Sequence, residues 1–172
     1  MRANTGHPKP GRMAESGSGW RGWAVTSGVV AVSSNTALAL PDFGGPLEDG
    51  CLAGREAEAL EDAVKLDGPR CYVSAKRALV RWVRRQAPGW MEEGVRLNVI
   101  APGPVRTPLR DRDRAHPVIG PNFDAFPQPS GRPAEAEEIA GAIGFLLRHP
   151  YCAGSVLCVD GGGDAVMRAD SV

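Results

Sequence analysis

Three short runs of mostly apolar residues, at positions 28–32, 95–101 and 155–159, stand out between more polar stretches of the chain. Each run is followed directly by Ser, Pro or Asp. Short runs of this kind suit strands of a parallel sheet, whose two faces are both covered. We therefore predict three buried strands.

Residues 41–70 are predicted to form an inserted unit between the first two strands. Positions 41–46 contain two Pro and two Gly residues and indicate a loop. Apolar residues at helical spacing then predict one amphipathic helix over positions 52–66, with Ala53, Ala57, Leu60 and Val64 on its apolar stripe. A helix packed on the core, an oligomer contact and a cover over a site all fit this pattern. Asp67-Gly68-Pro69 is expected to end the helix.

A second helix is predicted to begin near Tyr72 and to continue through Arg85. Its inward face consists of Ala75, Leu79 and Val83, with Trp82 as a further candidate, and its solvated face of Arg77, Arg81, Arg84 and Arg85. Pro88 is expected to end this helix, because proline removes a backbone hydrogen bond.

A third amphipathic helix is predicted over positions 133–148, with Pro133 in its first turn and acidic residues after it, as the helix dipole favours. Its core face would comprise Ile139, Ile143, Leu146 and Leu147. Residues 110–130 indicate a loop with short helical pieces, suited to a lid over a substrate. Strands that alternate with helices in this way indicate an α/β fold.

Composition narrows the possible functions. The 172 residues suffice for one domain, and the 20 Lys and Arg balance the 20 Asp and Glu, so no electrostatic footprint for nucleic acid or an anionic membrane is visible. The four cysteines and three histidines are scattered, which argues against a metal site. A disulfide framework is not expected either. We therefore predict reduced thiols and a cytoplasmic protein. Residues 1–22 indicate an irregular or non-native leader, and 23–172 the domain. The uncharged stretch 23–41 is punctuated by polar residues, which disfavours a membrane span.

Tyr72 and Lys76 are the candidate residues for chemistry. Residues four apart on a helix share one face, with Cβ atoms roughly 5–6 Å apart. A cation beside a phenol favours the phenolate, and this is one way to make an acid/base catalyst from a tyrosine near neutral pH. The spacing alone is a weak signal, since both residue types are common on helices.

The order of the motifs resembles the catalytic half of the short-chain dehydrogenase/reductase family. A strand ending in Ser33-Ser34 precedes Tyr72-x-x-x-Lys76, and a strand running into Pro102-Gly103, with Thr107 nearby, follows. The last strand then ends in Asp160-Gly161-Gly162. The resemblance covers about residues 23–172. The inserted segment and positions 94–98 and 164–168 further resemble the branch of 3α-hydroxysteroid dehydrogenase/carbonyl reductase-like enzymes.

The resemblance implies an NAD(P)-dependent oxidoreductase that interconverts a secondary alcohol, hydroxysteroid- or alcohol-like, and a ketone. Tyr72 would be the general acid/base, and Lys76 would assist it and bind the nicotinamide ribose. Ser34 would hold the substrate oxygen, with Ser33 as the neighbouring candidate. The implied cofactor-binding residues are Tyr72, Lys76, Pro102, Gly103, Val105 and Thr107. The implied assembly is a homodimer or homotetramer.

One motif of the family has no counterpart. In the family, a glycine-rich turn G-x-x-x-G-x-G follows the first strand and binds the pyrophosphate of the cofactor. This chain has no such motif. Its candidates Gly17, Gly19 and Gly22 have another spacing, and no predicted strand precedes them. The expected fold is therefore a partial Rossmann fold, a doubly wound parallel sheet lacking its N-terminal dinucleotide-binding βαβ half and exposing one edge.

The missing glycine-rich turn affects the expected cofactor binding and therefore the expected activity. NAD and NADP cannot be distinguished from these residues, and we expect the chain to bind either one weakly or not at all; micromolar affinity by calorimetry would contradict this. The alternative to an active oxidoreductase is a truncated, inactive remnant that acts at most as an interaction or oligomerisation partner. Nucleic-acid binding through the arginine face is disfavoured by the neutral charge.

Overall fold

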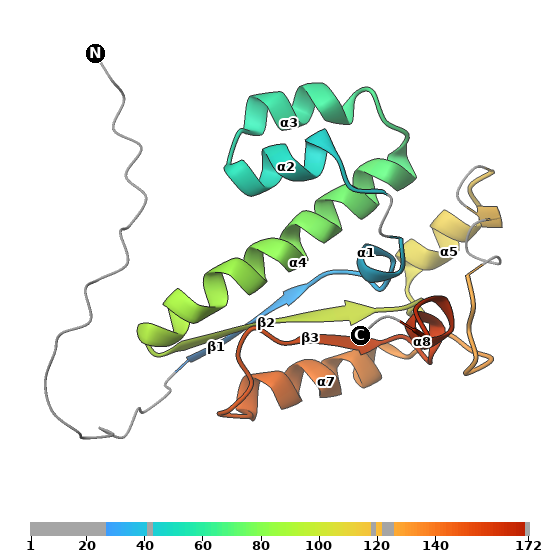
Figure 1. Ribbon diagram of the computed structural model, residues 1–172. Helices are drawn as coiled ribbons and strands as arrows, with labels where there is room; N and C mark the ends of the chain where they lie inside the picture. Colours follow the sequence, from blue (N-terminus) through green and yellow to red (C-terminus); the bar gives the residue numbers. More distant parts are fainter. Residues whose placement is uncertain (1–26, 41–42, 118–119, 122–125, 171–172) are drawn as a thin grey trace, which may run out of the picture.

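The computed structural model describes residues 27–40, 43–117, 120–121 and 126–170. All three predicted strands are present, and each agrees with its predicted bounds to within one residue at either end. They are β1 (Ser27–Val32), β2 (Val95–Pro102) and β3 (Val156–Val159). The strands form one parallel sheet in the order β1-β2-β3, with Ser27 opposite Val95 and Val99 opposite Val156. Figure 1 shows this sheet between two long helices.

The two helices cover opposite faces of β2. Leu97 and Val99 pack against α4 (Gly68–Glu92), whereas Ile100 packs against α7 (Ala136–Arg148). Successive side chains of a strand point to opposite faces, so these alternate positions divide the core into two clusters. This layering confirms the α/β class and the parallel sheet inferred from the sequence.

Two polar residues of β2 hold the α7 layer in place. The buried guanidinium of Arg96 donates to the carbonyls of Leu146, Leu147 and His149 at 2.6–2.8 Å, where the end of α7 lacks intrahelical partners. The Asn98 amide donates to Cys152 O and accepts from Ser155 N. A buried strand tolerates these residues because most of their polar groups find backbone partners, with Arg96 Nε as the exception in this pair.

Helix α4 is longer than predicted, and its predicted inward face is confirmed in part, since Leu79 and Val83 belong to the core. It begins at Gly68 with Asp67 as its N-cap, whose carboxylate accepts from Arg70 N at 2.8 Å, and it runs through Pro88 to Glu92. Ala87 is buried and Trp90 packs on the same cluster, so tertiary packing holds the turn that proline weakens. Ala75 and Trp82 are exposed, and the prediction that they face inward was wrong.

The inserted unit contains separate short helices instead of one. In the described part of residues 41–70 they are α2 (Pro46–Ala53) and α3 (Glu56–Ala63), and a further short helix, α1 (Thr36–Ala39), lies just before this unit. Gly54, with φ of 69°, ends α2 in the left-handed conformation that glycine accommodates best. The predicted stripe is not the buried face, since Leu60 and Val64 are 61% and 84% exposed, while Ala59 is buried against Gly50.

The described C-terminal part contains two further short helices: the first is one of the helical pieces expected within residues 110–130, and the second was not predicted. α5 (Pro108–Arg114) follows Thr107, and α8 (Gly163–Met167) follows the glycine turn. Helix α7 starts at Ala136, after a capping box formed by Glu135 and Glu138, so Pro133 precedes its first turn. Ile139 and Leu146 are buried as predicted, but Leu147 is exposed.

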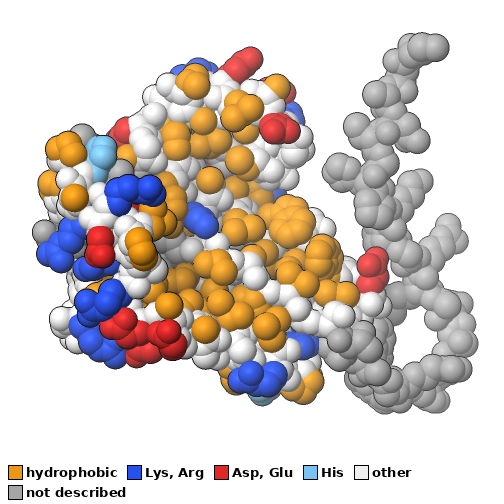
Figure 2. All heavy atoms as spheres, turned by 180° about the vertical axis from the view of Figure 1, so that it is seen from behind, with side chains coloured by type: hydrophobic (Ala, Val, Ile, Leu, Met, Phe, Trp, Pro, Cys, Tyr) orange, Lys and Arg blue, Asp and Glu red, His pale blue; other side chains and the backbone are white. Residues whose placement is uncertain are grey.

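Among the described residues, β1 is hydrogen-bonded to a neighbouring strand on one side only. Val29 and Val32 of this strand are exposed. Figure 2, which shows the face opposite to the view of Figure 1, has hydrophobic side chains gathered across its middle. The expected exposed edge is therefore present in the part of the chain that the structure describes. No helix within that part is long and apolar enough to cross a membrane.

Leu146→Ala tests the α7 side of the core. Leu146 is almost completely buried between α7 and the sheet, and truncating such a side chain costs about 2–5 kcal/mol because a cavity remains. The free energy of unfolding, measured by urea denaturation, should fall by that amount. Leu60→Ala on α3 is the control and should change it by less than about 0.5 kcal/mol; equal losses in the two variants would show that the core has been misplaced.

Candidate functional site

The carboxyl ends of the three strands are joined by hydrogen bonds that continue past the sheet. Ser33 N donates to Ile100 O at 2.8 Å, and Asn35 N donates to Pro102 O at 2.9 Å. On the other side of β2, Gly103 N donates to Val159 O at 3.0 Å. The serine turn and the Pro-Gly turn therefore lie side by side, at the edge where open α/β sheets bind ligands.

Tyr72 and Lys76 lie one turn apart near the start of α4, beside the end of β1. The ammonium of Lys76 is 5.8 Å from the centroid of the Tyr72 ring and donates to Val32 O at 3.0 Å. The Tyr72 side chain is 49% exposed. The structure thus brings the predicted tyrosine–lysine pair to the strand that precedes Ser33 and Ser34.

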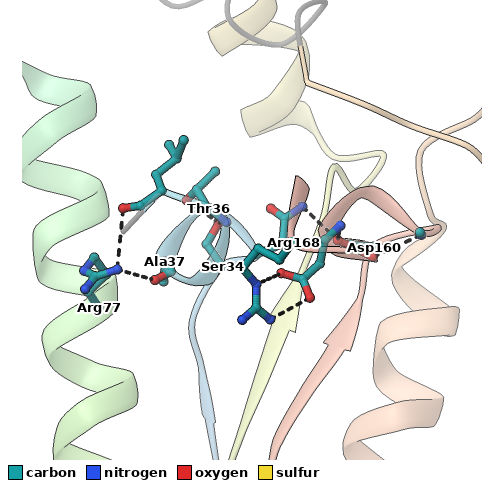
Figure 3. Close-up of polar contacts among 10 residues, drawn as sticks. Ser34, Thr36, Ala37, Arg77, Asp160 and Arg168 are labelled. Carbon is teal, nitrogen blue, oxygen red and sulfur yellow. Dashed lines mark hydrogen bonds and ion pairs between the residues drawn. The ribbon is translucent and has the colours of Figure 1, made fainter. Parts of the chain in front are cut away.

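The two serines have different partners. Ser33 Oγ donates to Lys76 O at 3.0 Å, which commits its proton to the backbone of α4. Ser34 Oγ shares a 2.9 Å hydrogen bond with Thr36 Oγ1 and accepts from Thr36 N at 3.4 Å. Ser34 and Thr36 lie together on this turn in Figure 3. Among the described contacts none joins Ser34 directly to Tyr72.

The four residues predicted on the nicotinamide side each have a structural contact. Pro102 ends β2. A Cβ on Gly103 would lie 2.7 Å from Asp160 Cβ, so only glycine allows the β3 turn to approach this closely. Val105 forms an isolated bridge with Ala134 and packs beside the α7 cluster. The Thr107 hydroxyl accepts from Arg110 N at 3.2 Å and caps α5.

Asp160 is a residue of this edge to which the sequence analysis gave no role. Its Oδ2 accepts from Asn35 Nδ2 at 3.1 Å and from Asp164 N at 2.6 Å, and its Oδ1 accepts from Gly162 N at 3.1 Å. The side chain therefore links the serine turn to the turn after β3. An aspartate that precedes three glycines is a known turn signal, and it could have indicated the contacts with Gly162 and Asp164. The contact with Asn35 spans the sheet and has no local signal.

A buried carboxylate, Glu48 of α2, was also missed. Glu48 accepts from Arg77 Nε at 3.1 Å and from Arg81 Nη1 at 2.8 Å. Burial raises the pKa of Glu48, but the hydrogen bonds and charges of Arg81 and Arg77 outweigh it and hold the pKa below its usual value. The prediction that Arg77 belongs to a solvated face was therefore wrong, since its side chain is only 19% exposed, whereas Arg81, Arg84 and Arg85 are exposed as predicted.

The thiol of Cys158 on β3 lies beside a second ionic group. Asp164 and Arg168 form a bidentate pair with both contacts at 2.7 Å, drawn next to Asp160 in Figure 3. Burial, followed by the nearby charges of Asp164 and Asp160, raises the pKa of Cys158 to about 12. This thiol stays protonated at neutral pH, and it therefore acts as a packing group rather than as a nucleophile.

Comparison with known protein families shows to which family the chain belongs. The model described as enoyl-(acyl carrier protein) reductase, a model of short-chain dehydrogenases/reductases, matches residues 59–164, which is more than half of the chain. The chain belongs to the short-chain dehydrogenase/reductase family. The match contains Tyr72, Lys76 and the turn after β2, so it covers most of the site described above.

Curated relatives and solved structures agree with this family. The chain is 40% identical over 144 residues to the 3-alpha-hydroxysteroid dehydrogenase/carbonyl reductase of Comamonas testosteroni, covering 81% of the chain and 56% of that protein. It is 38% identical over 95 residues to the human 3-oxoacyl-[acyl-carrier-protein] reductase, covering 55% and 38%. It also resembles the structure of the 3-alpha-hydroxysteroid dehydrogenase from Pseudomonas sp. B-0831 in complex with NADH. That match has a TM-score of 0.79 and 40% identity, and it covers 84% of this chain and 58% of that one.

The chain thus spans little more than half the length of the hydroxysteroid dehydrogenases that it matches. Levodione reductase is a more distant structural neighbour, with a TM-score of 0.57 and 25% identity over 79% of this chain and 46% of that chain. These likenesses confirm the partial Rossmann architecture inferred from the sequence.

The raised pKa of Cys158 has a measurable consequence. In a variant that keeps only Cys158, with the other three cysteines replaced by serine, the thiolate fraction at pH 8 should be roughly 10⁻⁴, so that reaction with Ellman's reagent is slow. A matched variant that keeps only the exposed Cys51 should react at least about a hundredfold faster. The two rates should converge in urea. Equal rates in the folded proteins would contradict the assignment.

Proposed function

We propose that the chain carries the catalytic residues of an NAD(P)-dependent oxidoreductase that interconverts a secondary alcohol and a ketone. The observation that carries this proposal is the position of Lys76, whose ammonium lies between the Tyr72 ring and the Val32 carbonyl at the end of β1. This contact brings the acid/base pair of the family's chemistry to the turn that holds Ser34.

In this proposal Tyr72 handles the proton. Its hydroxyl gives a proton to the substrate carbonyl oxygen in the reductive direction and takes it from the alcohol in the oxidative direction. Ser34, whose hydroxyl is shared with Thr36 rather than with a backbone carbonyl, holds the same oxygen and stabilises its developing charge. Lys76 keeps a positive charge beside the Tyr72 ring. A bound nicotinamide dinucleotide would supply or accept the hydride.

The residues present fit the nicotinamide part of such a cofactor. The Lys76 ammonium has three N–H donors and uses one of them on Val32 O, so that others are available to ribose hydroxyls. The Thr107 hydroxyl accepts a hydrogen bond in capping α5 and still has its own proton to donate. Pro102, Gly103 and Val105 border the same edge. Two structural relatives were crystallised with NADH and with NADP, so the class of cofactor is supported but the choice between the two is not.

The substrate is proposed from the names of the relatives. A curated protein that matches 81% of this chain is a 3-alpha-hydroxysteroid dehydrogenase/carbonyl reductase, and a hydroxysteroid or a similar small alcohol or ketone is therefore the substrate class to assay. We also propose a homodimeric or homotetrameric assembly in the cytoplasm.

Tyr72→Phe tests the proposal. The change removes only the phenolic hydroxyl, and loss of a general acid/base lowers turnover by about 10²–10⁴-fold. Ketone reduction should be followed by the loss of NADH or NADPH absorbance, with circular dichroism to confirm the fold. Tyr151→Phe is the matched control, because Tyr151 is the other of the two tyrosines and is 95% exposed. Unchanged turnover in Tyr72→Phe would remove its assigned role.

A second candidate function, that of an interaction partner without catalysis, is favoured by one observation. The edge of β1 is unpaired in the described residues, and Val29 and Val32 are exposed along it; such an edge can pair with another chain. Wild-type protein that shows no turnover with either cofactor, but forms a defined oligomer by light scattering, would favour this candidate over the oxidoreductase.

A further inference from the structure

The inserted helix α2 is attached to α4 through an ionic cluster around one buried carboxylate. Glu48 is only 1% exposed, and its two carboxylate oxygens accept from Arg77 and Arg81 separately. A second contact lies one turn earlier on α4, where Ser74 Oγ donates to Phe43 O at 2.6 Å. A buried carboxylate is stable only while its partners stay in place, so the cluster couples the position of α2 to that of α4.

Arg77 reaches beyond this cluster. Its Nε belongs to the Glu48 contact, whereas its Nη1 donates to Ala37 O at 3.3 Å and lies 3.5 Å from Leu40 O. Figure 3 shows the guanidinium extending from α4 toward the Ala37 carbonyl. They belong to α1 and its C-cap, where helix carbonyls lack intrahelical partners. A helix of four residues is not stable by itself, so outside contacts must hold it.

The neighbouring residue on α4 holds the other end of the same segment. Lys76 Nζ donates to Val32 O, and Lys76 O accepts from Ser33 Oγ. Residues 76 and 77 therefore contact the chain on both sides of Ser34, before it at positions 32–33 and after it at positions 37–40. Ser34 O itself accepts from Ala37 N at 3.1 Å, which ties its backbone to α1.

We propose that Arg77, oriented by the buried carboxylate of Glu48, is a positioning residue that sets the Ser34 turn against α4. In this arrangement the inserted helix α2 is part of the support of the site. The structural claim rests on the contacts above, and its catalytic consequence rests on the proposed oxidoreductase function.

The chemistry of arginine provides a way to separate the two contacts. A guanidinium is planar and can donate from two edges at once, whereas a lysine ammonium is a single point charge. Arg77→Lys keeps a positive charge for Glu48 but cannot serve both Glu48 and the α1 carbonyls. Glu48→Gln removes the charge that orients Arg77. Arg84→Lys, at an exposed position on the same helix, is the matched control.

Amide hydrogen exchange resolved by residue is the test, performed on the whole chain. The reporters are the amides of residues 37–40, which donate to Ser34 O, Asn35 O and Thr36 O within the turn. In Arg77→Lys they should exchange at least about tenfold faster than in the wild type, while the β2 amides of Val99 and Ile100 change less than about twofold. Glu48→Gln should act in the same direction, and Arg84→Lys should change neither group.

Ile139→Val, in the core cluster on the other side of the sheet, is the control for a general loss of stability. If Arg77→Lys accelerates all amides by one common factor, as we expect of Ile139→Val, or leaves residues 37–40 unchanged, the positioning role is wrong. If Arg77→Lys accelerates exchange at 37–40 and Glu48→Gln does not, the role assigned to Glu48 is wrong.

A kinetic measurement keeps this inference distinct from the proposed function. In a wild type that turns over substrate, Arg77→Lys should lower kcat about tenfold or more with a smaller change in KM, since a misplaced Ser34 affects the reacting oxygen more than binding. An unchanged kcat would refute the catalytic consequence. A wild type without turnover refutes the proposed function, and the exchange rates then still decide the structural claim.

Discussion

The parallel pairing of β2 with both of its neighbours is the constraint on which the rest of this structure depends. β2 is buried on both faces, and its alternating side chains create one core with α4 and another with α7. Hydrogen bonding continues beyond the ends of the strands, from Ser33 to Ile100 and from Gly103 to Val159. The three turns that follow the strands are therefore held at one edge, and the candidate site can form only there.

Side chains then convert this edge into a defined arrangement of groups. Lys76 and Arg77 bind the serine turn from α4, and Asp160 binds Asn35 from the far side of the sheet. Each contact joins segments that are 40 or more residues apart. The Ser34 hydroxyl is thereby left with Thr36 on a turn that is fixed from two directions, as the role proposed for Ser34 in stabilising a reacting oxygen requires.

The strands, α7 and the tyrosine–lysine spacing could be read from the sequence because their signals are local. A strand shows its β-branched run and a helix its apolar period, and Tyr72 and Lys76 share a helix face whatever packs around them. The prediction for the inserted unit was wrong because local spacing does not show which residues will be buried. Leu60 and Val64 have helical spacing, but Gly54 divides the segment and Ala59 is the residue that packs against the neighbouring helix. Pro88 was misread because packing of Ala87 and Trp90 outweighs the local cost of proline.

By itself, the sequence determined the α/β class, the order of the motifs and the helical spacing that places Tyr72 one turn before Lys76. Only the tertiary structure decided which arginines are solvated, which serine is committed to the backbone and how the inserted helix meets the site. These outcomes depend on partners far apart along the chain, such as Glu48 with Arg77 and Ser33 with Lys76. A residue's type limits which contacts it can make, but desolvation and geometry in the folded chain select the ones that form.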